Sequence, residues 1–451
     1  MGLEIGIGWL TLIMFGSLLL LLMAGLPLAF VTGGLACVFL FILGDWQTLN
    51  IVPSRIFPLM TNYQLSAIPL FIFMAAMLER AGIINDMFDV IYKVLGGVKG
   101  GLAAATIIAS TILAAMVGVI GAAVVTMGII ALPAMLKRHY NPEIAMGSIM
   151  AGGTLGILIP PSILAIIYAV VAEQSVGELF IGAVFPGLLL SSLYIFYVIA
   201  RSYIDPSLGP PAPMEERLSF REKIRVMSKM SAPVTLVVVV LGVIFSGVAT
   251  PVEAAGIGTF GAFIVAAIHR KLDWPTVQGA CLTTLKATAM VIWIMFGATI
   301  FVGLYVLEGG QQFVSNAMQG MGLGPWGILI FMQIILIFLG MFLDWVGILL
   351  LCVPIFVPII KGLGAASFGL ETGDDLVLWF GVLYLVNMQM SFLSPPFGYA
   401  LFYLRGVAPP EIPMTRIFKA ALPFLTIQLI GLVLCMVFPE IITWLPKVVY
   451  G

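Results

Sequence analysis

Two pairs of adjacent prolines interrupt apolar stretches in which a membrane-spanning helix would otherwise continue. The first pair lies in GILIPPS, residues 156–162, and the second in FLSPPFG, residues 392–398. Proline lacks a backbone N–H and obstructs the helix before it, so carbonyl oxygens near each pair lose their helical donors. Such carbonyls suit a hard cation such as Na⁺, and the N–H groups that start the next helix suit an anionic solute. The chemistry available at both places is therefore ion and anion binding.

The rest of the composition is that of a polytopic membrane protein. Of 451 residues, 61% are hydrophobic and 9% are charged, and the mean hydropathy is +1.16. Apolar windows of about 20 residues, the length that crosses a bilayer, recur along almost the whole chain, so we expect phospholipid around it. A net charge of −1 excludes a strong attraction to nucleic acid. Four single cysteines and two separated histidines argue against a disulfide framework or a zinc site.

The proline pairs lie in two halves of the chain that resemble each other. Pro160 and Pro395 occupy corresponding places, because each interrupts a long apolar segment that follows a proline-containing apolar stretch. The most polar stretch, residues 204–231, separates the first half, residues 1–203, from the second, residues 232–451. Paired interrupted segments in corresponding halves are typical of secondary transporters with inverted repeats.

We therefore expect an all-α polytopic membrane protein with two re-entrant hairpins. The hairpins are predicted at residues 144–172 and 376–404, with the prolines at their tips. Each segment is long enough for two short arms and long for one upright helix. The alternative is a pair of kinked spanning helices.

Charges beside the interrupted segments favour insertion from opposite faces. Basic residues at 137–139 precede the first segment, whereas acidic residues at 371–375 precede the second. Because cytoplasmic loops are enriched in Lys and Arg, this difference indicates inverted halves. One group of basic residues conflicts with this interpretation. If residues 177–203 form one span after a hairpin, the basic residues at 217–229 lie on the face opposite Lys137, and both groups cannot then be cytoplasmic.

Ionisable groups at membrane depth are costly and are candidates for function. Asp344, in GMFLDWVGILLLCVP, is the clearest one, although it also fits an interfacial position where one span ends and another starts. No lysine follows a glycine, so the GK pair of a phosphate-binding loop is absent and ATP hydrolysis by that route is excluded. The driving force is then an ion gradient or the gradient of the solute.

Backbone and hydroxyl oxygens near the prolines are the expected ligands. In the first segment these are Gly156, Ile159 and Pro160 through carbonyls and Ser162 through hydroxyl and amide; the second offers Ser391, Ser394 and Pro395. Two glycine-containing joints, residues 114–123 and 342–347, are places where a broken helix completes each site, or where glycines allow close helix packing.

Several stretches together resemble the large membrane subunit of the tripartite ATP-independent periplasmic (TRAP) transporters, the DctM-type or SiaM-type permease. They are IPLFIFMAAMLERAGI, GGTLGILIPPSI, ATPVEAAGIG, FLDWVGILLLCVPIFVPI and SFLSPPFGYALF. The resemblance implies an elevator-type carrier of the bacterial inner membrane, driven by Na⁺, that imports organic acids from a periplasmic binding protein. It also implies a small four-helix membrane subunit. Since the family-like sequence starts near Met1, we expect that subunit as a separate chain.

The resemblance also implies at least two Na⁺ sites and a solute site. One Na⁺ site would use Val117, Val119, Gly156, Ile159 and Pro160, and the other Gly340, Asp344, Ser391, Ser394 and Pro395. Solute would contact Ser162, Asp344 and Val119.

The first joint departs from the sialic-acid branch. That branch tends to have Ser-Gly-Ser where this chain has Val117, Gly118 and Val119. A polyhydroxylated sugar would lose hydrogen-bond partners there, and unmet polar groups in a dry site are costly. We therefore expect a smaller anion: a 2-oxo acid, a hydroxy acid, a C4-dicarboxylate or an aromatic acid.

Two alternatives stay open at this point. A stand-alone ion-coupled organic anion transporter would need no binding protein. The ion-translocating subunit of a membrane redox complex would need a file of buried Lys, Glu and His, and a membrane enzyme would need clustered His, Asp or Glu; neither pattern is present.

Val119→Ser tests the solute argument. We expect it to change the preference between two solutes by about fivefold, the effect of one added hydrogen bond. Na⁺ dependence should persist, because carbonyls hold the cation. The measurement is uptake of competing organic anions into proteoliposomes, and an unchanged preference would contradict a solute contact at Val119.

Overall fold

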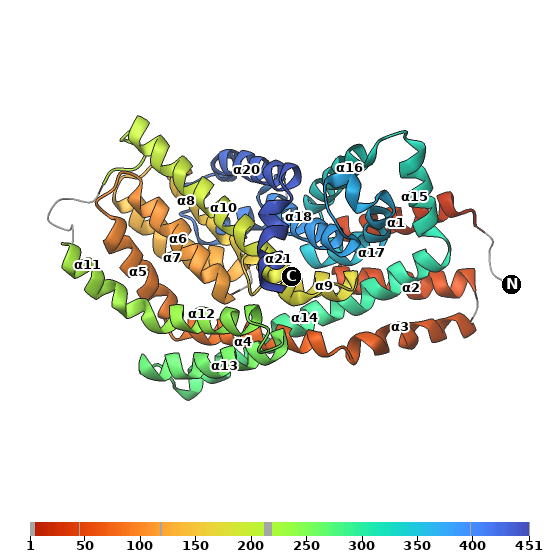
Figure 1. Cartoon of the computed structure of the whole chain (residues 1–451), viewed down its shortest axis with the longest axis horizontal. Coiled ribbons are helices and arrows are strands. Elements are labelled where there is room, and N and C mark those ends of the chain that lie inside the picture. Colours follow the sequence, from red (N-terminus) through yellow and green to blue (C-terminus); the bar gives the residue numbers. More distant parts are fainter. Residues whose placement is uncertain (1–4, 45, 118–119, 212–218, 397, 451) are drawn as a thin grey trace.

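The computed structural model describes residues 5–44, 46–117, 120–211, 219–396 and 398–450, and all regular elements in these ranges are helices (Figure 1). This agrees with the all-α class predicted from the sequence. The helices before residue 100 are α1 (Ile7–Met23), α2 (Leu28–Leu43), α3 (Ile51–Met60), α4 (Ala67–Arg80) and α5 (Ile83–Leu95).

The remaining helices form two similar series joined by a middle group. The first series is α6 (Gly101–Val117), α7 (Ile120–Lys137), α8 (Pro142–Thr154), α9 (Ile163–Ala172) and α10 (Val176–Ile204). The middle group is α11 (Phe220–Met227), α12 (Ser231–Phe245), α13 (Pro251–Ile268), α14 (Trp274–Leu307) and α15 (Gly310–Gly320). The second series is α16 (Pro325–Gly340), α17 (Trp345–Leu363), α18 (Gly373–Leu393), α19 (Tyr399–Val407) and α20 (Met414–Val437), followed by α21 (Glu440–Tyr450).

Length and composition make this a membrane-spanning fold. Among the described residues, six helices are long and apolar enough to cross a bilayer: α10, α13, α14, α17, α18 and α20. The number rises to eight if two bent pairs each count as one span, such as Trp46–Met60 with Tyr63–Arg80, which meet at 61°. Many large apolar side chains are exposed, including Leu20 and Phe196, as expected for a surface that faces lipid.

Helices α6 and α7 form an antiparallel hairpin. At its base, the backbone N–H of Leu102 donates to the Tyr140 hydroxyl (3.2 Å), so the start of α6 lies beside the end of α7. At its other end, Gly152 and Gly153 of α8 contact Ser110 of α6 and Val124 of α7. The two arms therefore return to the same face of the molecule, and their far ends lie against the last turn of α8.

The first proline pair lies in a helix that crosses the whole molecule. Gly147 of α8 packs against Phe424 in the first half of α20, whereas the Tyr168 hydroxyl of α9 donates to the Val377 carbonyl (2.9 Å). Val377 is beside the far end of α20, because the Trp379 indole N–H donates to the Cys435 carbonyl (2.9 Å). The segment from α8 to α9 therefore runs along α20, from its first half to its last turn.

The second series repeats this arrangement in the opposite direction. Trp326 at the start of α16 contacts Phe368 after α17 (ring centroids 5.3 Å apart), so α16 and α17 form a second hairpin. The Tyr384 hydroxyl of α18 donates to the Trp345 carbonyl at the hairpin's inner end (3.1 Å). Beyond the proline pair, Tyr403 of α19 contacts Gly121 at the start of α7, and Leu404 and Val407 contact Gly128 halfway along α7, so α19 runs from the tip of the first hairpin toward its base. Helices α18 and α19 therefore cross antiparallel to α8 and α9.

The hairpins thus lie elsewhere than the sequence predicts. Two hairpins are present, but they are residues 101–137 and 325–363, and the proline-containing segments expected as hairpins, 144–172 and 376–404, follow the kinked-helix alternative. The joints at 114–123 and 342–347 fall at the hairpin tips. Apolar arms of 16 to 19 residues are long enough for a hairpin arm or a short span, so only packing distinguishes the two.

This correction removes the charge conflict. Because residues 142–172 cross the membrane once and α10 crosses back, the segment after α10 returns to the base of the first hairpin. Its contacts agree: the Leu208 carbonyl accepts from the Asn141 N–H (3.0 Å) and the Gly209 carbonyl from the Gly100 N–H (2.8 Å). The basic segment and Lys137 are on the same face.

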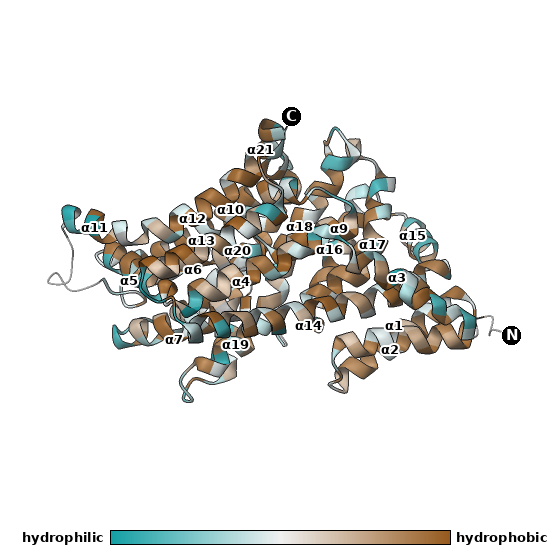
Figure 2. Ribbon diagram, turned by 90° about the horizontal axis from the view of Figure 1, so that it is seen from below, coloured by the Kyte–Doolittle hydropathy of each residue, from teal (hydrophilic) through white to brown (hydrophobic). Residues whose placement is uncertain are grey.

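An outer layer of helices flanks this core. Helices α2, α3, α4, α13 and α14 lie together along the lower edge of Figure 1. Gly33 of α2 faces Gly297 of α14, and the Thr259 hydroxyl of α13 donates to the Leu70 carbonyl of α4 (3.0 Å). Helix α14 has 34 residues, about 51 Å at 1.5 Å per residue, so it must tilt within a bilayer core of about 30 Å. Figure 2 shows hydrophilic residues on α11 and α15 and a largely hydrophobic surface between them.

Gly147→Leu should destabilise the fold. A side chain at Gly147 would overlap the Phe424 ring and the Ala420 carbonyl, and overpacking a tight contact costs about 1–3 kcal/mol. Gly34→Leu is the control, because nothing lies within 4 Å of a Cβ at Gly34 on α2. We expect a lower melting temperature in detergent for Gly147→Leu only; equal melting temperatures would contradict the close packing of α8 on α20.

Candidate transport site

The first break follows from the two prolines at the end of α8. Pro160 and Pro161 have no N–H, so Gly156 and Ile157 lose the donors that would continue the helix. The Ile157 carbonyl is satisfied instead by the Ser162 hydroxyl. A short 3₁₀ turn, Leu155–Ile157, ends the helical run, and Ile159 and Pro160 follow in an irregular segment that is buried. The Gly156 carbonyl is left without its helical donor at membrane depth.

Ser162 starts the helix beyond the first break. Its hydroxyl accepts from the Ala165 N–H (3.3 Å) while it donates to Ile157, and the residue is 1% exposed. Both interactions stabilise the N-terminus of α9, the end of a helix that attracts anions. The Ser162 hydroxyl therefore stabilises both sides of the break, by donating to the carbonyl before it and accepting from the first turn of α9.

The second break has the same pattern. Pro395 removes the i+4 donor of the Ser391 carbonyl, which accepts instead from the Ser394 N–H (3.4 Å), and Ser391 precedes Pro395 by the same interval as Gly156 precedes Pro160. The hydroxyls of Ser391 and Ser394 donate to the Asn387 carbonyl (3.4 Å) and the Met390 carbonyl (2.7 Å), so their oxygen lone pairs stay available as acceptors. The break thus presents oxygen atoms in a buried position.

The second hairpin closes on this break. Gly340, the last residue of α16, lies so close to Ser391 that any side chain at Gly340 would overlap it. Asp344 begins α17 and its carboxylate accepts from the Val346 N–H (3.4 Å). Among the expected residues, Gly340, Asp344, Ser391 and Ser394 are therefore brought together by the tip of one hairpin and one broken helix.

The first hairpin approaches the first break from the other half. Val117 is the last residue of α6, whereas Gly118 and Val119 lie outside the described residues. Gly152 and Gly153 hold the arms of this hairpin against α8, just before Gly156. The hairpin arms and the first break are thus neighbours, as the second hairpin and the second break are.

Sequence reasoning missed two tyrosines and a glutamine near these breaks. Tyr399 lines the same gap as Leu343 and Trp345, the two neighbours of Asp344, and the Tyr403 ring lies against Gly121 of the first hairpin. Gln389 is fully buried, and neither atom of its amide has a partner among the described residues. The spacing of Tyr399 and Tyr403 along one helix was the available signal.

The position that corresponds to Gln389 in the first half is Thr154. Each of these residues lies two positions before the residue whose carbonyl loses its donor, Ser391 or Gly156. The Thr154 hydroxyl accepts from the Gln428 amide (3.2 Å), so the first half gives this polar group a partner in α20. The polar side chain at this position is therefore hydrogen-bonded at the first break, and at the second it has no partner among the described residues.

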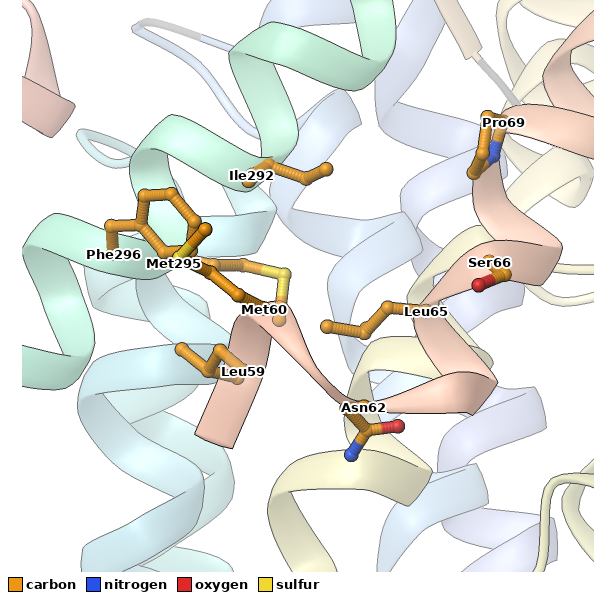
Figure 3. A pocket seen from close by; sticks show the side chains of 9 residues that line it. All are labelled: Leu59, Met60, Asn62, Leu65, Ser66, Pro69, Ile292, Met295 and Phe296. Carbon is orange, nitrogen blue, oxygen red and sulfur yellow. The ribbon is translucent and has the colours of Figure 1, made fainter. Parts of the chain in front are cut away.

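A cavity of about 350 Å³ lies away from the breaks (Figure 3). It is at the bend between α3 and α4, facing α14, and its lining is mostly apolar, with Asn62 and Ser66 as polar groups. The gap beside Gly340, Ser391 and Tyr399, in contrast, has no room for a water molecule. The second break is therefore closed in this structure.

Two broken helices thus cross antiparallel, each with a hairpin at its break, as in a secondary transporter. The family described as the DctM component of the tripartite ATP-independent periplasmic transporter matches residues 15–441. This chain belongs to that family. It is therefore a multi-pass transport protein of the bacterial inner membrane and not an enzyme. It is 32% identical over 396 residues to the C4-dicarboxylate TRAP transporter large permease protein DctM of Pseudomonas aeruginosa, covering 87% of this chain and 88% of that protein.

Two further comparisons concern the fold and the partners of this DctM component. The chain is similar to the crystal structure of the YdaH transporter of Alcanivorax borkumensis, with a TM-score of 0.65, 14% identity and coverage of 95% of this chain and 99% of that chain. This likeness is one of fold. The isethionate TRAP transporter permease protein DctMQ of Oleidesulfovibrio alaskensis is 28% identical over 430 residues, which cover 95% of this chain and 65% of that protein.

Asp344→Asn separates charge from structure at the second break. Asparagine also caps a helix, so α17 should keep its start, but the negative charge is lost. If the carboxylate lies beside a bound cation, we expect the Na⁺ concentration for half-maximal uptake to rise about tenfold, the effect of roughly 1.4 kcal/mol.

The measurement is a Na⁺ titration of solute uptake in proteoliposomes. Asp374→Asn, in the first turn of α18 and exposed, is the control that removes a charge at the surface. Superimposable curves for Asp344→Asn and the wild type would place the Asp344 carboxylate outside the cation site.

Proposed function

We propose that this chain is the Na⁺-coupled membrane subunit of a TRAP transporter that imports a small organic anion delivered by a periplasmic binding protein. The observation that carries the proposal is the mirrored pair of breaks: two antiparallel helices, each interrupted at a proline pair, each with a hairpin beside the break. In such transporters the ion and solute sites lie at interrupted helices near the midplane. Residues 1–203 and 232–451 are then the two inverted halves, joined by residues 204–231.

Each break supplies the oxygen atoms that a cation site needs. At the first, we propose the carbonyls of Gly156, Ile159 and Pro160 with the hairpin end at Val117 and Val119; at the second, Gly340, Asp344, Ser391, Ser394 and Pro395. The fit is supported by the missing helical donor of Gly156, by the hydroxyl oxygens of Ser391 and Ser394, and by the Gln389 amide, which has no partner among the described residues beside the second break. A bound Na⁺ would supply positive charge at both breaks. Solute would then contact Asp344, Val119 and the N-terminal end of α9 at Ser162.

The distribution of charge gives the orientation. Lys137, Arg201, Arg270 and Arg416 lie at the end of the molecule that holds the base of the first hairpin, where Arg416 pairs with Glu143 (3.7 Å). Glu371 and Asp375 lie at the opposite end, where both pair with Lys447. By the positive-inside rule, the base of the first hairpin faces the cytoplasm and that of the second faces the periplasm.

An elevator motion is consistent with the division into core and outer layer. Hairpins and broken helices would move as one unit, α6 to α9 with α16 to α19, against α2, α3, α4, α13 and α14. Between α4 and α7, the Thr126 hydroxyl donates to the Glu79 carboxylate (3.3 Å) across this boundary. Such a hydrogen bond contributes only about 1.5–3 kcal/mol, so it can be exchanged for another when the unit moves.

The DctMQ relative supports the small membrane subunit as a partner. The region that matches this chain covers 65% of that protein, and its name joins the two permease components. We propose that here the small four-helix subunit is a separate chain. We propose a small organic anion as the solute; the Pseudomonas relative is named for a C4-dicarboxylate, which is one such anion.

Reconstituted transport tests the proposal. Proteoliposomes with this chain, the small subunit and the binding protein should take up organic anion under an inward Na⁺ gradient, and uptake should fall at least about tenfold when K⁺ replaces Na⁺. Equal uptake with K⁺ would exclude Na⁺ coupling. Full uptake by this chain alone would instead favour a stand-alone carrier that needs no binding protein.

A further inference from the structure

A stripe of aromatic rings runs along α19 just after the second break. Tyr399 and Tyr403 are four residues apart, so they project from the same side of the helix, with ring centroids 6.5 Å apart. Phe392, at the end of α18, extends the stripe, with its centroid 5.8 Å from that of Tyr399. Three aromatic rings thus follow one another across the break.

This stripe lies where the two halves of the transporter meet. The Tyr403 ring is 3.1 Å from the position that a Cβ would occupy at Gly121, in the first turn of α7 and so near the tip of the first hairpin. Leu343 and Trp345, which flank Asp344 at the tip of the second hairpin, line the same gap as Tyr399. Residues from both hairpins therefore surround the tyrosines, and Gly121 leaves space for the Tyr403 ring.

The tyrosine rings are not fully used in packing. Tyr403 is 39% exposed and Tyr399 is partly exposed, whereas Phe392 is buried. A half-exposed aromatic ring beside a transport site offers a flat apolar face with a hydroxyl at its end, the combination that binds a planar apolar group and a polar substituent together.

The nearby charges do not suit a second carboxylate. Asp344 is negative, and Arg405 on the same helix as the tyrosines donates to the Ile412 carbonyl (2.6 Å), so its guanidinium is directed to the loop after α19. A short dicarboxylate would place its second charge against apolar rings, and a buried charge without a partner is costly.

We propose that Tyr399 and Tyr403 form the aromatic wall of the solute site and select an aromatic monocarboxylate. The carboxylate lies toward the breaks, where helix N-termini and a coupled cation favour negative charge, and the aromatic ring packs on the two tyrosines. This inference rests on the proposed function, because it assigns a solute class to the same site.

Direct binding to the permease tests this inference independently of the periplasmic protein's own selectivity. The probes are radiolabelled benzoate and succinate, bound in the presence of Na⁺ to this chain with its small subunit in lipid nanodiscs. The variants are the double substitution Tyr399→Leu with Tyr403→Leu, and Tyr399→Phe with Tyr403→Phe, which keeps both rings. Tyr203→Leu, an exposed tyrosine at the far end of α10, is the matched control.

We expect wild-type protein to bind benzoate more tightly than succinate. The double Leu variant should lose about tenfold in benzoate affinity with succinate affinity changed less than about twofold, and the Phe pair and Tyr203→Leu should bind benzoate within about threefold of wild type. Tighter binding of succinate, or equal losses for both anions, would overturn the aromatic wall and leave the proposed function standing. Absence of Na⁺-dependent binding of either anion to the wild type would also overturn the aromatic wall, whereas the proposed function is tested separately by Na⁺-dependent uptake in proteoliposomes.

Discussion

The demand that every backbone polar group at membrane depth find a partner governs this structure. A helix meets that demand by itself, and two prolines in succession remove two of its donors. At the first break, one freed carbonyl is satisfied by the Ser162 hydroxyl and another, that of Gly156, is not satisfied by the helix. The cost of such an exposed oxygen is acceptable only where another element covers it, and the hairpins are those elements.

The placement of glycines follows from the same demand. Hairpin arms can cover a break only if they approach it closely, and Gly152 and Gly153 at the first break and Gly340 at the second occupy positions where a side chain would overlap its neighbour. Close backbone approach in membranes depends on small residues, because lipid offers no driving force that would compensate for poor packing. The breaks thus require small residues around them, because only these allow a hairpin to cover the freed carbonyls.

The sequence allowed several parts of this architecture to be predicted. The proline pairs, their corresponding places in the chain and the polar segment at 204–231 indicated two related series with interrupted helices, and the structure has two such series. The location of the hairpins could not be derived, because apolar arms of this length look the same whether they turn back or cross. The basic residues after α10 were the available evidence: they lie on the same face as Lys137 only if the first proline-containing segment crosses the membrane.

The sequence predicts a candidate site only where the backbone dictates it. Gly156 and Ser391 are predicted from the proline that follows each by four residues, and Asp344 from its charge; these assignments stay predictions. Tyr399 and Tyr403 were not recognised, because tyrosines in an apolar run resemble ordinary membrane-facing residues until the opposite hairpin is placed beside them. Gln389 became conspicuous only once its amide was found buried and unpartnered among the described residues.

The position of the segment after α10 also matters while the chain is being made. Residues 208 and 209 are tied by hydrogen bonds to the base of the first hairpin, and Arg221, Lys223 and Arg225 follow on the same face. In the orientation proposed above, these positive charges stay in the cytosol, and positive charges retained there fix the orientation of helices inserted after them. The midpoint of the chain would then act as the anchor from which the second half is inserted during synthesis.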